Sequence, residues 1–404
     1  MKLENMLAYV AENNDFYQKI IQEHNITSPT DITQFPILSR QTLQENINNI
    51  LSKDYKNQHM TNQLYRLSSS GTSGISTETY WDPMQYDRSM LCLWRRRRKY
   101  YNISANEKYI DFMLKSFNTI KTDALYYAIR GNNISVNRLG LNNKTVMAEL
   151  FELINKTKPV WLQIAPSVME MILNFYYEEH SSLPESIRYI EFLSEVLTDS
   201  IRKQTMEVFP NASLSNMYGS EEMNSIAFEC PCGKMHILSD NVFAECYNGS
   251  FLSPTGEGTI ILTNLHNMAT PLIRYDQGDE VVIEPKQKCA CGYSDKIISH
   301  LIGRKSSSAI INGLRLSTCD VSDIMIVISN KFGNPIKKYK FIYNDKNKTL
   351  LCYTLFNKHF AEWKEQIWTL IENLFIRKYG EVKMCFFMDD IDEKSYKHDL
   401  FTVK

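Results

Sequence analysis

The chain has 404 residues, of which 43% are hydrophobic and 23% charged, and its formal net charge at pH 7 is −1. This length exceeds what one hydrophobic core usually supports, and the near-zero charge gives no general attraction to polyanions, so we expect several domains and no nucleic-acid partner. No apolar run approaches the roughly 20 residues of a membrane span, and the first residues do not form a cleavable leader, so we expect a cytoplasmic protein without a membrane partner.

The first part of the chain surrounds a loop of small residues. Short helices with polar joints are predicted over 1–60, followed by short strands at 64–67 and 77–81. Between these strands, residues 68–74 are all serine, threonine or glycine and are followed by Ile75 and Ser76. The Asp-Pro pair at 82–83 has the order of a helix cap and a first helical residue, so a helix is expected to begin there.

The helix that begins at 83 carries the one basic run of the sequence, Arg95 to Arg98, directly after Trp94. We expect these arginines to form a solvated face of the helix. The alternative is a docking patch for an acidic partner or a phosphorylated cofactor.

Helices and strands alternate from about residue 145 to 220, and this order predicts an α/β layered sheet. Residues 240–285 are richer in strands, and after residue 304 a new set of strands and helices begins. We therefore predict an α/β fold with an N-terminal domain at 1–303, a β-rich part of it at about 225–300, and a small α+β C-terminal domain at 304–404. The predicted helices are near 145–157, from 166, after 199 and at 359–377, and the predicted strands are at 160–164, 187–193, into 218, 339–343, 349–355 and 382–388.

Four segments carry residues suited to binding a nucleotide. The loop Ser69-Ser70-Gly71-Thr72-Ser73-Gly74 offers backbone N–H groups and hydroxyls for phosphate oxygens, although it lacks the Gly-Lys-Ser/Thr end of a Walker loop. Taken alone, this loop is equally well read as a flexible surface turn. The other segments, in chain order, are Met217-Tyr218-Gly219-Ser220-Glu221-Glu222, then Pro271-Leu272-Ile273-Arg274-Tyr275-Asp276-Gln277-Gly278-Asp279, then Ile302-Gly303-Arg304.

Together these segments resemble the adenylate-forming superfamily, and within it the phenylacetate-CoA ligase family. That family has a Ser-Ser-Gly-Thr-Thr-Gly loop, followed by Tyr-Gly-x-Ser/Thr-Glu, Pro-Leu-Ile-Arg-Tyr-Asp-Thr-Gly-Asp and Gly-Arg. The stretches Asn14-Asp15-Phe16-Tyr17 and Phe35-Pro36-Ile37-Leu38-Ser39 are similar to its N-terminal signature. The resemblance runs from about residue 8 to the end, and it implies the adenylate-forming enzyme fold, in which the C-terminal domain is a mobile lid.

The resemblance implies roles for these side chains. The loop 69–74 would wrap the phosphates of ATP, and the turn Tyr218-Gly219-Ser220 would lie at the nucleotide, with the tyrosine stacked on adenine. Glu222 would hold Mg²⁺, a hard cation that takes carboxylate and phosphate oxygens. Asp279 would accept hydrogen bonds from the ribose hydroxyls, with Arg304 nearby.

A lysine near the C-terminus is also implied, because its ammonium can neutralise charge that builds up on the α-phosphate and carboxylate oxygens. Lys397, in Ser395-Tyr396-Lys397, stands where the family has Ser-Gly-Lys and is the residue we choose. Lys394 is the alternative.

Three positions depart from the family pattern. The Ser/Thr before the catalytic glutamate is Glu221, and the lysine that often follows the phosphate loop is replaced by Ile75-Ser76-Thr77. The acidic residue expected soon after Gly-Arg is replaced by Lys305-Ser306-Ser307. These changes bear on nucleotide affinity and on domain rotation more than on the fold.

Two Cys-x-Cys-Gly segments form a second candidate site. The chain has nine cysteines and no secretory signal, so we expect reduced thiols and read clustered cysteines as metal ligands before disulfides. Such a set suits a tetrahedral, structural Zn²⁺ that staples the β-rich part; buried cysteines that cluster by coincidence are the alternative. The family pattern corresponds to Cys230, His236, Cys289 and Cys291, with Cys232 as a competing fifth candidate.

The predicted function is ATP- and Mg²⁺-dependent activation of a small carboxylic acid to an acyl-adenylate with release of pyrophosphate, followed by transfer to a thiol. CoA is the default acceptor, with a carrier-protein pantetheine or an amine as alternatives, and the family analogy favours an aryl or arylacetic acid. Residues 161–167, 194–195 and 216–217 are expected to line the acid pocket. A rival from another class is a zinc-stapled protein that binds nucleotide or acyl-adenylate without turnover.

Overall fold

A computed structural model describes most of the chain, which divides into two compact units. The first unit is Met1–Ala105 with Ser215–Leu301, and the second is Asn106–Leu214 with Ile302–Lys404. The loop 69–74, Lys394 and Lys397 lie outside the described residues. The described residues are 1–68, 77–113, 120–121, 125–138, 141, 143–179, 181–304, 308–332, 335–356, 358–388 and 401–403.

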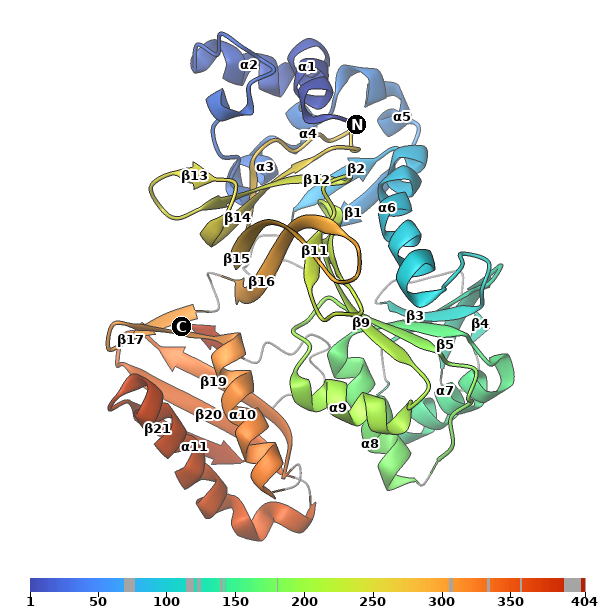
Figure 1. The fold of residues 1–404 in the computed structure, drawn as a ribbon, viewed down its shortest axis with the longest axis vertical. Coiled ribbons are helices and arrows are strands. Elements are labelled where there is room, and N and C mark those ends of the chain that lie inside the picture. Colours follow the sequence, from blue (N-terminus) through green and yellow to red (C-terminus); the bar gives the residue numbers. More distant parts are fainter. Residues whose placement is uncertain are drawn as a thin grey trace. The chain divides into compact units, whose positions relative to one another are not determined.

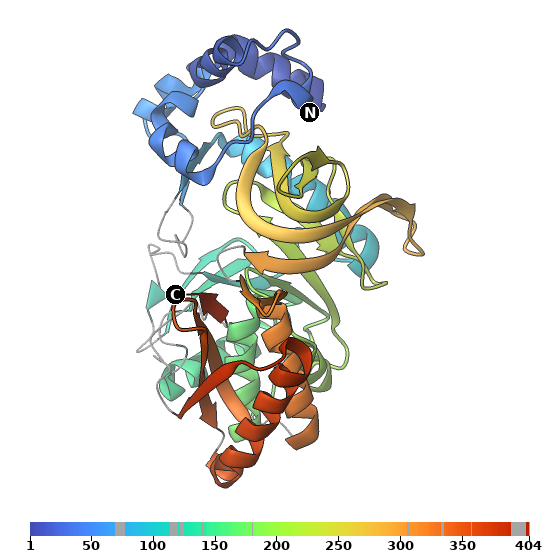
Figure 2. The ribbon, with the colours of Figure 1, turned by 90° about the vertical axis from the view of Figure 1, so that its left-hand side faces the viewer.

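The first unit begins with short helices, as the sequence predicts, and they lie beside its curved strands (Figures 1 and 2). The buried Asn14 ends one helix and caps the next: its Oδ1 accepts from the backbone N–H groups of Phe16 and Tyr17. Its Nδ2 donates to the carbonyl of Ile50, which ties the second helix to a later one. The helical segments are α1 (Leu3–Asn13), α2 (Asp15–Glu23), η1 (Ile32–Gln34), α3 (Arg40–Glu45), α4 (Ile47–Ile50), η2 (Lys53–Tyr55) and α5 (Lys56–Met60).

A hairpin and a long helix follow. Strands β1 (Tyr65–Ser68) and β2 (Glu78–Trp81) pair antiparallel on either side of the small-residue loop, as predicted. Asp82 accepts a hydrogen bond from the N–H of Gln85 and so caps α6 (Pro83–Tyr101), which confirms the predicted helix start. None of the helices in the described ranges is long and apolar enough to cross a membrane.

The rest of the first unit is β-rich. Its strands follow one another in the order β13-β12-β14-β15-β16-β11-β10-β9, and the pairs β12–β14, β14–β15, β11–β16 and β9–β10 are antiparallel. Apolar residues of these strands and of the N-terminal helices share one core. The strands are β9 (Ser213–Ser220), β10 (Asn224–Glu229), β11 (Met235–Ile237), β12 (Val242–Tyr247), β13 (Leu252–Ser253), β14 (Gly256–Asn264), β15 (Tyr275–Lys288) and β16 (Ser294–Arg304).

The N-terminal helices are joined to the start of β15 by buried polar contacts. The Tyr17 hydroxyl donates to the Pro271 carbonyl and accepts from the N–H of Ile273. Leu38 exchanges backbone hydrogen bonds with Arg274 and Asp276 and so forms a parallel β-bridge with Tyr275, the first residue of β15. The short apolar segment that precedes α3 therefore lies beside this strand. These bonds fix the place of α3 relative to β15.

In the second unit, residues 106–214 form a mixed sheet covered by helices, with β4 and β5 antiparallel at one edge. The strand order is β8-β7-β3-β6-β5-β4, in which β8, β7, β3 and β6 are parallel. Apolar faces of these strands and of the helices form one core. The elements are β3 (Tyr109–Met113), β4 (Ile120–Lys121), β5 (Tyr126–Arg130), β6 (Asn133–Asn137), α7 (Lys144–Thr157), β7 (Trp161–Ile164), α8 (Pro166–Glu178), β8 (Tyr189–Leu193) and α9 (Asp199–Val208).

The last hundred residues have a sheet and a core of their own. The sheet order is β21-β20-β19-β22, and α10 and α11 pack together on it (Figure 1). The helix predicted at 359–377 begins instead as a 3₁₀ segment and becomes α-helical at Lys364. The elements are β17 (Ser308–Ile311), β18 (Leu314–Ser317), α10 (Thr318–Phe332), β19 (Ile336–Asn344), β20 (Thr349–Phe356), η4 (Lys358–Trp363), α11 (Lys364–Tyr379), β21 (Lys383–Met388) and β22 (Phe401–Val403). The domain boundary at 303/304 stays a prediction.

Candidate functional site

Glu222 lies in the turn between β9 and β10, and its carboxylate is buried, with 3% of the side chain exposed. The Thr77 hydroxyl donates to Oε1 at 2.7 Å, and the Tyr275 hydroxyl donates to the same oxygen at 3.2 Å. Burial and the nearby Glu222 charge raise the pKa of Tyr275, so this phenol stays a donor at neutral pH. Two hydroxyls thus hold the glutamate in one orientation.

A guanidinium completes the surroundings of Glu222. Arg40, the first residue of α3, places a terminal nitrogen 3.9 Å from Oε1 and donates from it to the carbonyl of Gln277 at 3.1 Å. The neighbouring Glu221, which replaces the family's Ser/Thr, is exposed. A buried carboxylate with this set of partners is suited to hold a divalent cation beside an anionic ligand.

Three other residues predicted to contact nucleotide, Tyr218, Ser220 and Asp279, belong to a second network on β9 and β15. The Tyr218 hydroxyl donates to Oδ2 of Asp279 at 2.7 Å, and the Gln277 amide donates to the same oxygen at 2.9 Å. The Ser220 hydroxyl donates to the Gln277 side chain at 3.0 Å, and Gly219 pairs with β10 in the strand ladder. The structure therefore brings the tyrosine, serine and aspartate of the sequence motifs together.

Sequence reasoning missed four members of these networks. Tyr275 and Gln277 lie inside the motif that ends at Asp279, so only their roles were missed. Thr77 follows the loop, and Arg40 follows the N-terminal signature by one residue. Arg304 is the last residue of β16, and its side chain is outside the described part.

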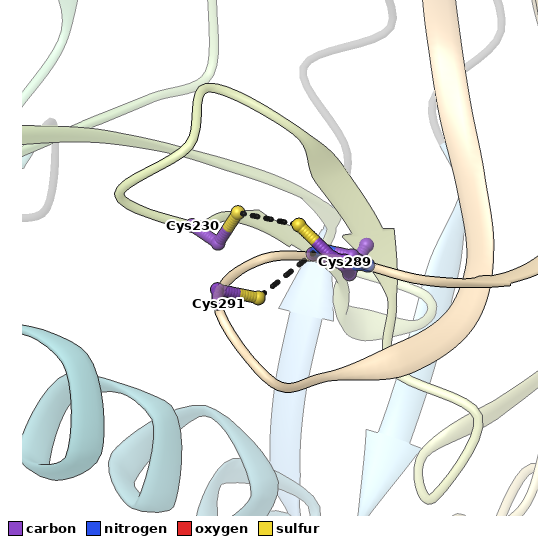
Figure 3. Close-up of side chains that lie close together, drawn as sticks. Cys230, Cys289 and Cys291 are labelled. Carbon is purple, nitrogen blue, oxygen red and sulfur yellow. Dashed lines mark hydrogen bonds between the residues drawn. The ribbon is translucent and has the colours of Figure 1, made fainter.

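Four of the predicted metal ligands come together at β11 and at the ends of β10, β15 and β16 that lie next to it. Cys230, His236, Cys289 and Cys291 each place one donor atom so that all four atoms lie within 4.8 Å of one another. Figure 3 shows the three cysteines of this group close together. Cys232 is exposed and is not one of these four residues, although its thiol lies close enough to interact with those of Cys289 and Cys230. The arrangement thus selects four of the five predicted candidates.

Two matching turns present the thiols. The Cys230 N–H donates to the carbonyl of Lys234, and the Cys289 N–H donates to the carbonyl of Tyr293. The glycine in each turn, Gly233 or Gly292, has a positive φ of 70° or 82°, a conformation that L side chains rarely adopt. The Cys-x-Cys-Gly spacing therefore reflects the same tight turn used twice.

The distances in the cluster fit a tetrahedral ion. Two thiolates bound at about 2.3 Å to one tetrahedral Zn²⁺ lie about 3.8 Å apart, and a thiolate and an imidazole nitrogen about 3.6 Å apart. The Cys230 and Cys289 sulfurs are separated by 3.9 Å, and the Cys291 sulfur lies 3.6 Å from Nε2 of His236. Burial lowers the pKa of His236, which favours the neutral imidazole that a metal requires.

The basic run of α6 lies against this cluster, so the predicted solvated face is wrong for two of its arginines. The Arg96 guanidinium stacks 3.9 Å from the ring centre of Tyr293, which also packs edge-on against His236. Arg97 is 2% exposed and stacks on Trp94. The other arginines of the run, at 95 and 98, are exposed. The stems and guanidinium planes of the inner pair contribute to packing rather than to solvation.

One expected wall of the acid pocket lies at the carboxyl end of β8. Glu195 accepts from both the backbone N–H and the hydroxyl of Ser167, each at 3.0 Å. The guanidinium of Arg138, just after β6, is 4.0 Å from the same carboxylate. Ligands of parallel α/β sheets bind beyond the carboxyl ends of the strands, which is where these residues lie.

Sequence comparison finds relatives of low identity among known proteins. No protein-family model matches the chain. It is 23% identical over 376 residues to Protein CapK from Staphylococcus aureus, an alignment that covers 84% of this chain and 80% of CapK. It is 26% identical over 197 residues to a phenylacetate-coenzyme A ligase from Thermus thermophilus, covering 47% of this chain and 43% of that enzyme.

Solved structures show the same fold. A 2-hydroxyisobutyryl-CoA ligase in the postadenylation state superimposes with a TM-score of 0.78 at 14% identity, covering 100% of this chain and 87% of that one. An anthranilate CoA ligase, AuaEII, in complex with anthranoyl-AMP gives 0.55 at 12% identity, covering 82% and 64%.

The chain has the mixed α/β fold of these two CoA ligases, with a C-terminal α+β domain, which confirms the predicted fold class. In sequence it is similar to a phenylacetate-coenzyme A ligase and to CapK, as the motifs predict.

Proposed function

We propose that the protein uses ATP to activate a carboxylic acid. A carboxylate oxygen attacks the α-phosphorus, the bond between the α-phosphorus and its bridging oxygen breaks, and pyrophosphate leaves. In the second step a thiol attacks the acyl carbon and AMP leaves, with the thiol proton passing to solvent. CoA is the default thiol; a carrier-protein pantetheine or an amine is the alternative acceptor, and an aryl or arylacetic acid is the favoured substrate.

The observation that carries this proposal is the buried Glu222, oriented by the hydroxyls of Thr77 and Tyr275. Glu222 would hold Mg²⁺, which supplies positive charge to the polyphosphate and to the leaving pyrophosphate. The side chain is held rigidly before any ligand arrives, so little free energy is lost to ordering it during the reaction.

The network around Asp279 would bind the nucleoside. Its carboxylate already accepts from Tyr218 and Gln277, and ribose hydroxyls are donors of the same kind. Loop 69–74 would wrap the phosphates, Gly219, Ser220 and Arg304 would lie close to the nucleotide, and Tyr218 would stack on adenine. Lys397, on a C-terminal domain 304–404 that rotates as a lid, would stabilise charge in the adenylation step.

We also propose a structural zinc ion at Cys230, His236, Cys289 and Cys291. Four protein donors close the coordination shell, so this ion would have no position for substrate and would act as a staple between the two Cys-x-Cys-Gly turns. Its support is the fit of the sulfur and nitrogen distances to a tetrahedron.

The test is pyrophosphate release measured over a panel of aromatic, fatty and amino acids, with and without CoA. At least one acid should stimulate release, and Glu222→Gln should lower that rate on the order of a hundredfold or more, because a metal-bridged charge interaction in the transition state is lost. Glu221→Gln is the matched control: its side chain is adjacent but exposed, and we expect nearly wild-type rates. Binding of ATP without release for any acid would favour the non-catalytic alternative.

A further inference from the structure

Arg40 lies beside Glu222 although it belongs to none of the four nucleotide-binding segments of the sequence. It begins α3 directly after the cap Ser39. The residue before that cap, Leu38, donates its N–H to the carbonyl of Arg274, just before β15, and accepts from the N–H of Asp276 in β15. These bonds fix the backbone of Arg40 beside β15. Its guanidinium donates to the Gln277 carbonyl, and only 15% of its side chain is exposed.

The Arg40 guanidinium has a donor nitrogen without an acceptor among the described residues. One terminal nitrogen donates to the Gln277 carbonyl and faces Glu222 at 3.9 Å, a distance too long for a hydrogen bond. The other terminal nitrogen, Nη1, is buried and has no hydrogen-bond partner in the part of the chain that the structure describes. Buried donors in proteins are nearly always paired, so an acceptor that is not among these residues is expected at Nη1.

The neighbours of Arg40 indicate what this acceptor is. Glu222 joins Arg40 to Thr77, whose hydroxyl donates to the same carboxylate oxygen. Thr77 is the last residue of the Ile75-Ser76-Thr77 segment, where the related family often has a lysine after its phosphate loop. The position where the family often has a lysine thus lies at Glu222, and so does the buried Arg40 nitrogen that has no partner among the described residues.

We propose that Arg40 donates Nη1 to a phosphate oxygen of bound ATP, so that the N-terminal helices supply the positive charge that the loop lacks. Guanidinium groups bind phosphate well because their N–H donors are fixed in a plane and always charged. The inference rests on the proposed function, since it needs ATP in the site that Glu222 defines.

The experiment measures ATP and adenosine binding to the full chain by calorimetry, with Mg²⁺ and in buffer without added Mg²⁺. Arg40→Gln should weaken ATP binding on the order of tenfold to a hundredfold in both buffers, the range for one charge-assisted hydrogen bond. Adenosine, which lacks phosphate, should bind as it does to the wild type. Gln41→Ala, the next and exposed residue of α3, is the matched control and should leave ATP binding unchanged.

Other outcomes decide against the inference. If Arg40→Gln weakens ATP binding only when Mg²⁺ is present, Arg40 acts by positioning Glu222 and does not touch phosphate. Equal losses for ATP and adenosine, or no loss, also overturn it. Arg40→Met is made in parallel, and if thermal melting shows that neither variant folds, the arginine is structural and the inference is overturned. A wild type that binds no ATP removes the proposed function itself, whereas a wild type that binds ATP with unaffected variants removes only the role of Arg40.

Discussion

The matched pair Cys230→Ser and Cys232→Ser tests the metal cluster with two substitutions in one turn. Cys230 lies in the cluster with its sulfur 3.9 Å from that of Cys289, whereas Cys232 is exposed outside it. Serine removes one of the four clustered donors in the first variant, and in the second an exposed thiol that contacts Cys289 and Cys230 without belonging to the four. We therefore expect Cys230→Ser to lose zinc and stability, and Cys232→Ser to keep both.

The size of the effect follows from linkage between metal binding and folding. An ion present at about 1,000 times its dissociation constant stabilises the folded state by about 4 kcal/mol, and this contribution is lost when the site no longer binds. In a unit of this size each kcal/mol corresponds to about 2–4 °C in melting temperature, so Cys230→Ser should melt roughly 10 °C lower. Cys232→Ser should melt within about 2 °C of the wild type.

The assay combines elemental analysis of protein prepared without chelator with thermal melting of both variants. The wild type and Cys232→Ser should each contain about one zinc per chain, and Cys230→Ser much less. Equal zinc content and equal melting temperature in the two variants would contradict the four-ligand assignment. Absence of zinc from the wild type would contradict the structural ion altogether.

Two further predictions concern a catalytic cation and a buried ion pair. Lys397→Ala should slow acyl-adenylate formation on the order of 10²- to 10³-fold while thiol attack on supplied acyl-adenylate continues, and Lys394→Ala should resemble the wild type; the reverse pattern would shift the assignment by three residues. Arg274→Met should lower the free energy of unfolding in urea by about 3–5 kcal/mol, because it leaves the buried Glu245 carboxylate without the guanidinium that donates to both its oxygens at 2.9 and 2.6 Å. An unchanged urea midpoint would show that Glu245 finds another partner.

Local signals in the sequence were enough for elements with strong caps or buried strands. The Asp-Pro pair at 82–83 marks the start of α6, and the apolar runs that become β7 and β8 are predicted within two residues. The helix predicted at 359–377 begins as a 3₁₀ segment, because helical periodicity does not distinguish the two hydrogen-bond patterns over one turn. The three-residue β22 pairs with a strand some sixty positions earlier, and a segment this short has no pattern of its own.

In the candidate site, too, residues within one motif could be predicted and contacts between distant segments could not. Tyr218, Glu222 and Asp279 belong to contiguous motifs, so their types and order indicated a shared site. Thr77 reaches Glu222 across 145 positions of sequence, a contact that exists only after folding. Likewise the helical pattern of α6 shows which arginines share a face but not that Tyr293 covers Arg96. The roles of loop 69–74 and Lys397 remain predictions, because both lie outside the described residues.

The docking of the N-terminal helices on β15 has a consequence for synthesis of the chain. Tyr17 hydrogen-bonds to Pro271, 254 residues later, and Leu38 bonds to Arg274 and Asp276. At about 5–20 residues per second, the helices emerge roughly 13–50 s before the strand that covers them. During this interval the apolar faces that end in the shared core, among them those of Met6 and Leu7, are exposed to water. A chain interrupted before residue 271 would release those faces permanently, so truncated products should aggregate or be degraded, whereas the finished chain buries them.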